Sequence, residues 1–126
     1  MIVVDSSTVI AIFRQEQDAA QFARRIAEDD QPMMSAANLV ETSIVLRGLK
    51  DIAPAKAERW LDDFIAAAGI RIEPVTADQA QLARSAHLRF GKGTEHRAAL
   101  NYGDCFADGL AKAMDAPCYA RVTTFR

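Results

Sequence analysis

Short apolar runs alternate along this chain with longer segments of helical spacing, and this alternation limits the folds that the chain can adopt. Residues 2–4, 33–35 and 70–73 are runs of three or four residues, each containing Ile, Val or Met, that predict strands. Because strands that alternate with helices form a parallel sheet covered on both faces, the sequence predicts a three-layer α/β/α fold with a short parallel sheet. In open sheets of this kind, sites form outside the carboxyl ends of the strands.

Residues that begin or end helices divide the rest of the chain. Pro54 suits the first turn of a helix, Gly69 ends that helix, and Asn101 can cap another. One apolar stripe, predicted to be buried, consists of Ala37, Val40, Ile44 and Val45. Helices are predicted over residues 6–13, 18–28, 36–49, 54–68, 77–90 and 101–114, with a polar loop over 91–99 and a last strand over 117–122.

The composition is that of an ordinary soluble domain. The chain has 126 residues and a net charge of −2, which suits one domain over residues 1–126 and gives no basic excess. RNA still fits as a substrate, because basic residues can cluster and a metal can hold phosphate. No run approaches the roughly 20 apolar residues that cross a bilayer. Cys105 and Cys118 lack C-x-x-C spacing and are expected as buried free thiols in a reducing cytoplasm.

Three acidic residues interrupt segments that are otherwise apolar. Asp5 ends MIVVD, Glu41 lies inside SAANLVETSIVL, and Asp104 lies inside NYGDCFADGLAK. A carboxylate on a face meant for burial is costly unless something pairs with it. Since no matching buried bases accompany these acids, they predict one shared site for a divalent cation.

Each acid also has a structural interpretation. Asp5 can cap the helix that follows it, Glu41 can pair with Arg47 or another base at the edge of the stripe, and Asp104 can act with Asn101 in a capping box. All three interpretations together are less plausible than any one, because each acid falls near a predicted strand end or on an inward face.

Carboxylates that crowd together repel one another and raise one another's pKa values, and a divalent cation removes this penalty. Mg²⁺ prefers oxygen ligands, keeps several waters, and binds few carboxylates together with substrate phosphate.

Other kinds of catalytic or metal site would need residues that this chain does not have at the required positions. Ser7 stands where a haloacid-dehalogenase-like phosphatase needs an acid, and His87 and His96 are isolated rather than spaced as zinc ligands. Arg89, Lys92 and Arg97 are candidates to meet RNA phosphates, with a solvated basic loop as the alternative.

Three stretches of the chain resemble the motifs of a known family. They are MIVVDSSTVIAI, SAANLVETSIVL and RFGKGTEHRAALNYGDCFADGLAKAMDAP. In order and spacing they resemble the PIN-domain ribonucleases, and among them the VapC-type toxins of type II toxin–antitoxin pairs. The resemblance implies a small α/β fold, RNA cleavage that depends on Mg²⁺ or Mn²⁺, a VapB-type antitoxin that blocks the site, and a homodimer. The family's three acids fall on Asp5, Glu41 and Asp104, which are therefore expected as metal ligands and catalytic residues. Ser7 matches a small hydroxyl residue that supports the first acid.

The chain departs from these toxins after Pro117. They continue with apolar residues and a Gly-Asp-Asp-Phe-like stretch that carries a fourth acid, whereas this chain has no acid after Asp115 and places Thr123 and Thr124 there. A hydroxyl is a far weaker metal ligand than a carboxylate. Asp108 is a candidate to compensate, although an acid in the first turns of a helix is usually solvated or favoured by the helix dipole.

Two hypotheses account for segment 118–126, which is either divergent or shifted in reading frame. If Pro117 to Phe125 are back-translated with free third bases and read from the last base of the proline codon, the shifted frame permits Leu-Leu, then Arg or Cys, then one further residue, and then Gly-Asp-Asp-Phe. The sequence therefore leaves two functions open. One is a metal-dependent endoribonuclease toxin that uses a metal-activated water, and the other is a weakened or inactive PIN-domain protein that binds an antitoxin without cutting RNA.

Overall fold

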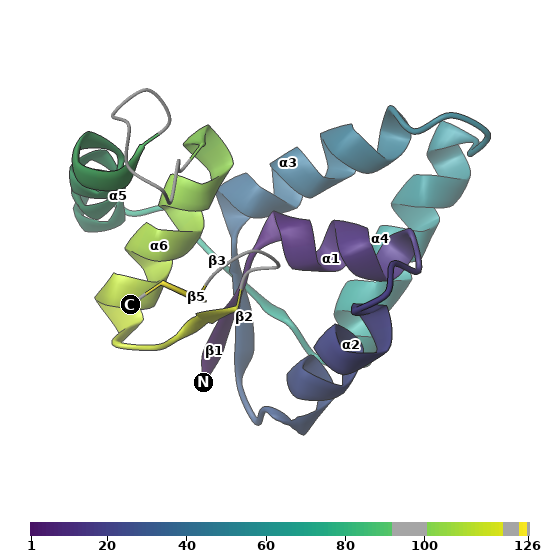
Figure 1. The fold of residues 1–126 in the computed structure, drawn as a ribbon, viewed down its shortest axis with the longest axis horizontal. Helices are drawn as coiled ribbons and strands as arrows, with labels where there is room; N and C mark the ends of the chain where they lie inside the picture. Colours follow the sequence, from purple (N-terminus) through teal and green to yellow (C-terminus); the bar gives the residue numbers. More distant parts are fainter. Residues whose placement is uncertain (92–100, 120–123, 126) are drawn as a thin grey trace.

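Five strands form one sheet in the computed structural model, which describes residues 1–91, 101–119 and 124–125 (Figure 1). The strand order is β3-β2-β1-β4-β5; the first four strands are parallel, and β5 is antiparallel to β4. The strands are β1 (Ile2–Val4), β2 (Pro32–Ser35), β3 (Arg71–Glu73), β4 (Cys118–Tyr119) and β5 (Thr124–Phe125). The helices are α1 (Ser6–Phe13), α2 (Ala19–Glu28), α3 (Ala36–Arg47), α4 (Pro54–Ala68), α5 (Ala77–Phe90) and α6 (Tyr102–Met114).

Helices cover both faces of the sheet, as Figure 1 shows, with α1, α2 and α4 on one side and α5 and α6 on the other. Successive residues of a strand point to opposite faces, so neighbours in β1 enter different cores. Val4 packs in a cluster with Val9 of α1 and Leu61 of α4, whereas Val3 packs in a cluster with Leu110 of α6. The predicted three-layer α/β/α fold with a short parallel sheet is therefore confirmed.

The predicted elements agree closely with the observed ones, because local signals set their ends. Pro54 is the first residue of α4, and Gly69 ends that helix in the left-handed conformation with φ 68°. The predicted last strand over 117–122 is found as β4 at Cys118–Tyr119, and residues 120–122 lie outside the described residues. An antiparallel partner, β5, pairs with β4. The predicted loop over 91–99 lies outside the described residues after Gly91.

The predicted burial of the apolar stripe on α3 was wrong. Val40 and Ile44 are 58% and 57% exposed, and Val45 is exposed as well. The buried face of α3 instead carries Asn38, Thr42 and Leu46, which are spaced four residues apart. Polar side chains can occupy this face because they are bonded there; the Thr42 hydroxyl donates to the Asn38 carbonyl over 2.7 Å.

Other predictions on the described residues can be checked directly. Cys105 and Cys118 are both buried and free, as predicted. His87 is exposed on α5, also as predicted. No helix among the described residues combines the length and apolar character that a membrane span requires.

Candidate metal centre

The carboxyl end of β1 lies where the chain order of the sheet reverses. The chain runs from β1 to β2 to β3 on one side, and β4 lies on the other side of β1. Open α/β sheets form their binding sites at such a reversal, outside the carboxyl ends of the strands. Asp5 follows β1 directly, and helix α3, which carries Glu41, follows β2 directly. Asp104 lies in the first turn of α6, a helix that contacts both α3 and β1.

Asp5 is a buried carboxylate that is only partly satisfied. It is 2% exposed and caps α1, and both the backbone N–H and the hydroxyl of Ser7 donate to its Oδ2, over 3.1 and 2.6 Å. Its Oδ1 is equally buried and accepts no hydrogen bond from the described residues. The capping interpretation is therefore correct for one oxygen and leaves the other unexplained.

Glu41 projects from the second turn of α3 and is half-buried. The side-chain amide of Asn38 donates to its Oε1 over 3.2 Å. The predicted alternative of a Glu41–Arg47 ion pair was wrong, because Arg47 lies 3.6 Å from Glu58 and bonds to Ser43. Within the described residues, no cation pairs with Glu41.

Asp104 takes part in the predicted capping box of α6. Its Oδ2 accepts from the Asn101 backbone N–H over 3.0 Å, and its own N–H donates to the Asn101 side chain over 2.9 Å. This arrangement uses only one carboxylate oxygen, so the capping role and a ligand role can coexist.

The electrostatics of the site tie the three acids together. Burial raises the pKa of Asp5 to about 6 against the opposing hydrogen bond from Ser7, and the charges of Asp104 and Glu41 raise it further. Burial also raises the pKa of Asp104, the Asn101 N–H lowers it, and the charge of Glu41 raises it again. Three like charges therefore act on one another at the carboxyl edge of the sheet.

The described side chains do not by themselves enclose a metal ion. No three of their His, Cys, Asp and Glu residues converge as a ready-made cage. Mg²⁺ keeps several waters and uses few carboxylates, so it does not require such a cage. The unpartnered Oδ1 of Asp5, together with two further carboxylates that repel it, supplies an oxygen donor set of that kind.

Two nearby residues are poor candidates for chemistry of their own. Burial, with the charges of Asp104 and Asp108, raises the pKa of the Cys105 thiol to about 11, so the thiol stays protonated and weakly nucleophilic. Asp108 is 2% exposed, and its Oδ2 lies 2.9 Å from the Lys112 ammonium. The interpretation of Asp108 as a solvated acid was therefore wrong.

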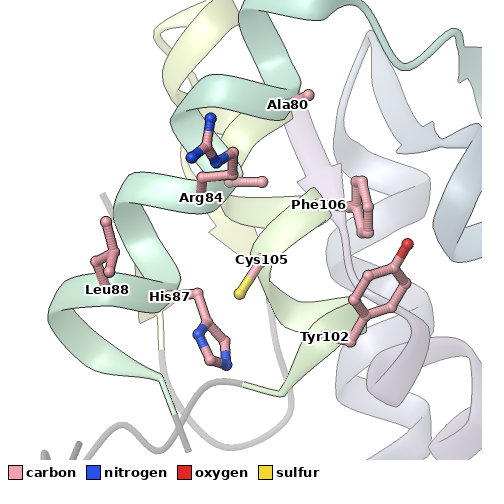
Figure 2. Close-up of a pocket in the computed structure, with 8 residues that line it drawn as sticks. Ala80, Arg84, His87, Leu88, Tyr102, Cys105 and Phe106 are labelled. Atoms are coloured by element: carbon pink, nitrogen blue, oxygen red, sulfur yellow. The ribbon is translucent and has the colours of Figure 1, made fainter.

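A hollow of about 430 Å³ lies between α5 and α6, and its lining includes Cys105, the residue after Asp104 (Figure 2). Figure 2 shows Arg84 and His87 on one wall and Tyr102 and Phe106 on the other, with Cys105 between them. Of the basic residues predicted to meet phosphates, Arg89 stacks its guanidinium 5.8 Å from the Phe90 ring centre. The other two, Lys92 and Arg97, lie outside the described residues, as does His96.

Sequence reasoning missed Asn38, which joins the elements that carry the three acids. The only signal in the sequence was its position three residues before Glu41, a spacing that places both on one side of a helix.

Comparison with known proteins identifies the family. The PIN domain model matches residues 2–124. Ribonuclease VapC28 of Mycobacterium tuberculosis is 44% identical over 110 residues, which are 87% of this chain and 80% of the relative. Ribonuclease VapC of Mycolicibacterium smegmatis is 40% identical over 125 residues, which are 99% of this chain and 94% of the relative.

Solved structures support the same fold at lower sequence identity. The crystal structure of VapC20 of Mycobacterium tuberculosis, described as a sarcin–ricin loop cleaving toxin, matches with a TM-score of 0.72 at 19% identity, covering 95% of this chain and 88% of that one. A toxin–antitoxin complex from Klebsiella pneumoniae matches with a TM-score of 0.66 at 16% identity, covering 96% and 86%. The sequence relatives and the fold together show that this chain belongs to the VapC ribonuclease toxins of the PIN domain family.

Proposed function

We propose that this protein is an endoribonuclease toxin that hydrolyses RNA phosphodiester bonds with Mg²⁺ or Mn²⁺ bound by Asp5, Glu41 and Asp104. The observation that carries the proposal is the buried Oδ1 of Asp5, which accepts no hydrogen bond from the described residues while two other carboxylates raise the pKa of the same side chain. A site built this way costs free energy until a cation occupies it. Relatives named ribonucleases, at 40% identity or more, support RNA as the substrate.

The residues of the chain have distinct tasks in this mechanism. When bound, Mg²⁺ or Mn²⁺ offsets the repulsion among the carboxylates, polarises a phosphate oxygen and acidifies a water. Ser7 orients Asp5 through two hydrogen bonds to one oxygen, which leaves the other oxygen for the cation. The capping box fixes Asp104 at the start of α6. No protein nucleophile is needed, in keeping with the raised pKa of Cys105.

The experiment that tests this proposal is RNA cleavage by purified protein with and without Mn²⁺. We expect cleavage with Mn²⁺, none after chelation, and a loss of at least about 100-fold in the Asp5→Asn variant, since several kcal/mol of charge stabilisation is removed. Asp18→Asn is a matched control, because Asp18 precedes α2 and makes no side-chain cap hydrogen bond. If wild type and Asp5→Asn behave alike in this assay, the nuclease proposal is rejected and a protein that binds without cutting is favoured.

We also propose two protein partners, a VapB-type antitoxin and a second copy of the chain. The solved toxin–antitoxin complex with the same fold supports the first partner. The exposed apolar side chains of Val40, Ile44 and Tyr102 support a protein contact on this side of the molecule.

The non-cutting alternative is favoured by one observation. The chain has no acid after Asp115, and Asp108, the nearest candidate to replace it, already pairs with Lys112. We propose that segment 118–126 of the single PIN domain is either divergent or the product of a one-base frameshift near Pro117. Sequencing the DNA tests the second origin; codons that cannot encode Gly-Asp-Asp-Phe in the neighbouring frame would exclude it.

A further inference from the structure

Asn38 is a fully buried polar residue on the inward face of α3, with 0% exposure. Its side-chain Nδ2 lies 2.9 Å from the Gly103 carbonyl, 3.1 Å from the Ser6 hydroxyl and 3.2 Å from Glu41 Oε1. An amide NH₂ has two hydrogens, so three acceptors from three helices share two protons.

Each acceptor lies beside one of the three acids. Ser6 follows Asp5, Gly103 precedes Asp104, and the third acceptor is Glu41 itself. The Ser6 hydroxyl also donates to the Asn38 backbone carbonyl over 3.2 Å, which doubles the connection between α1 and α3. One side-chain amide therefore links the three segments that carry the carboxylates, although they are 32 and 65 residues apart in sequence.

Gly103 closes the other side of the Glu41 carboxylate. A Cβ atom added at Gly103 would overlap both oxygens of the Glu41 carboxylate. The Glu41 carboxylate is therefore held between the amide of Asn38 and the bare Cα of Gly103. A neutral donor suits this position, since an additional charge would either repel the acids or compete with the cation for them.

We propose that Asn38 is a positioning residue, which sets the Glu41 carboxylate against Gly103 and ties it to the segments of Asp5 and Asp104 before a cation binds. This inference rests on the proposed metal-dependent function. Outer-shell partners that orient metal ligands are worth about 10- to 100-fold in metal affinity. The expected role of Asn38 is therefore in cation affinity, beyond its contribution to folding.

The first test measures Mn²⁺ binding without RNA, by the electron paramagnetic resonance signal of free Mn²⁺. The Asn38→Leu variant keeps the side-chain size but removes the donors, and we expect its Mn²⁺ dissociation constant to rise about 10- to 100-fold. Leu46→Ala is the matched control, because Leu46 is equally buried on the same face of α3, two turns away. This control should lower the melting temperature and leave Mn²⁺ affinity within about two-fold, since distant sites act independently.

The second test displaces Glu41 from the opposite side, with the Gly103→Ala variant. The new Cβ meets the end of one flexible side chain, and alanine is a better helix former than glycine. We expect a melting temperature at or above that of the wild type, together with Mn²⁺ binding that is about 10-fold weaker. A purely structural role for this contact predicts that stability and affinity change in the same direction.

The outcomes separate the inference from the proposed function. If wild type binds Mn²⁺ and Gly103→Ala and folded Asn38→Leu bind it equally well, Asn38 is only a packing residue and the inference is wrong, while the nuclease proposal stands. If Asn38→Leu does not fold, Gly103→Ala decides alone. If wild type itself binds no Mn²⁺, the proposed function fails, and the inference fails with it.

Discussion

At the scale of single residues, Asp5 is a buried carboxyl group whose charge opposes folding. Its folded-state pKa is raised from 3.8 to about 6, so the folded chain holds a proton more tightly than the unfolded chain. The stability that this proton contributes is fully present below the unfolded pKa and is lost as the pH rises through about 6. At neutral pH, metal-free protein therefore carries a buried carboxylate that opposes folding.

The raised pKa of Asp5 predicts that the Asp5→Asn variant is more stable than wild type at high pH when no metal is bound. In urea unfolding with a chelator, we expect the variant to exceed wild type by up to about 3 kcal/mol at pH 8, from about 1.4 kcal/mol per pH unit of pKa change. The difference should vanish near pH 3, below the unfolded pKa of 3.8, where wild-type Asp5 is largely protonated in both states. Saturating Mn²⁺ at pH 8 should reverse the order, because only wild type binds it. A variant that is no more stable than wild type at pH 8 would contradict the raised pKa.

Single residues of the site differ in how well the sequence reveals them. Asp5, Glu41 and Asp104 are conspicuous because an acid in an apolar segment needs a reason to be there. Asn38 is not conspicuous, since asparagine is ordinary on a helix surface and its three acceptors come together only in the folded chain. Whether the acids bind metal stays a prediction; their mutual electrostatic effect is what the structure adds.

At the scale of elements, local signals predicted where helices begin and end but not which face they bury. The capping residues of α4 and α6 act within one turn, so their positions are readable directly. The face of α3 is set by tertiary partners. The side-chain donors of Asn38 and Thr42 are bonded to neighbouring segments and to their own helix backbone, so both residues can be buried, which leaves Val40 and Ile44 outside. Hydrophobicity alone selects the wrong face in that situation.

The end of α4 gives a direct stability prediction. Gly69 has φ 68°, and an added Cβ would meet nothing within 4 Å, so the backbone alone penalises a side chain there. We expect Gly69→Ala to lower the free energy of unfolding by about 1 kcal/mol in urea. Gly48→Ala is the matched control at the end of α3, where φ is −87° and a Cβ makes ordinary contacts. It should be neutral or slightly stabilising, and equal losses at both positions would show that conformation is not the cause.

At the scale of the whole molecule, exposed apolar side chains gather on one side. Val40 and Ile44 of α3 line a hollow of about 250 Å³ against Tyr102 and Phe106 of α6. Tyr102 and Phe106 also line the hollow between α5 and α6, so the two hollows adjoin. Exposed apolar patches rimmed by polar residues mark protein contacts, and Glu41 stands at the edge of this one. A partner bound here would therefore lie beside the candidate metal centre.

The homodimer proposal predicts that this patch holds two copies together, with the same surface used by both as twofold symmetry requires. By light scattering, we expect wild type at twice the 13.8 kDa chain mass and Ile44→Glu at the chain mass, because a charge buried in an apolar interface costs several kcal/mol. Val75→Glu is the control, because Val75 is 39% exposed and lines neither hollow. A dimer that survives Ile44→Glu would place the interface elsewhere and leave the patch to a different protein, and a monomeric wild type would reject the homodimer.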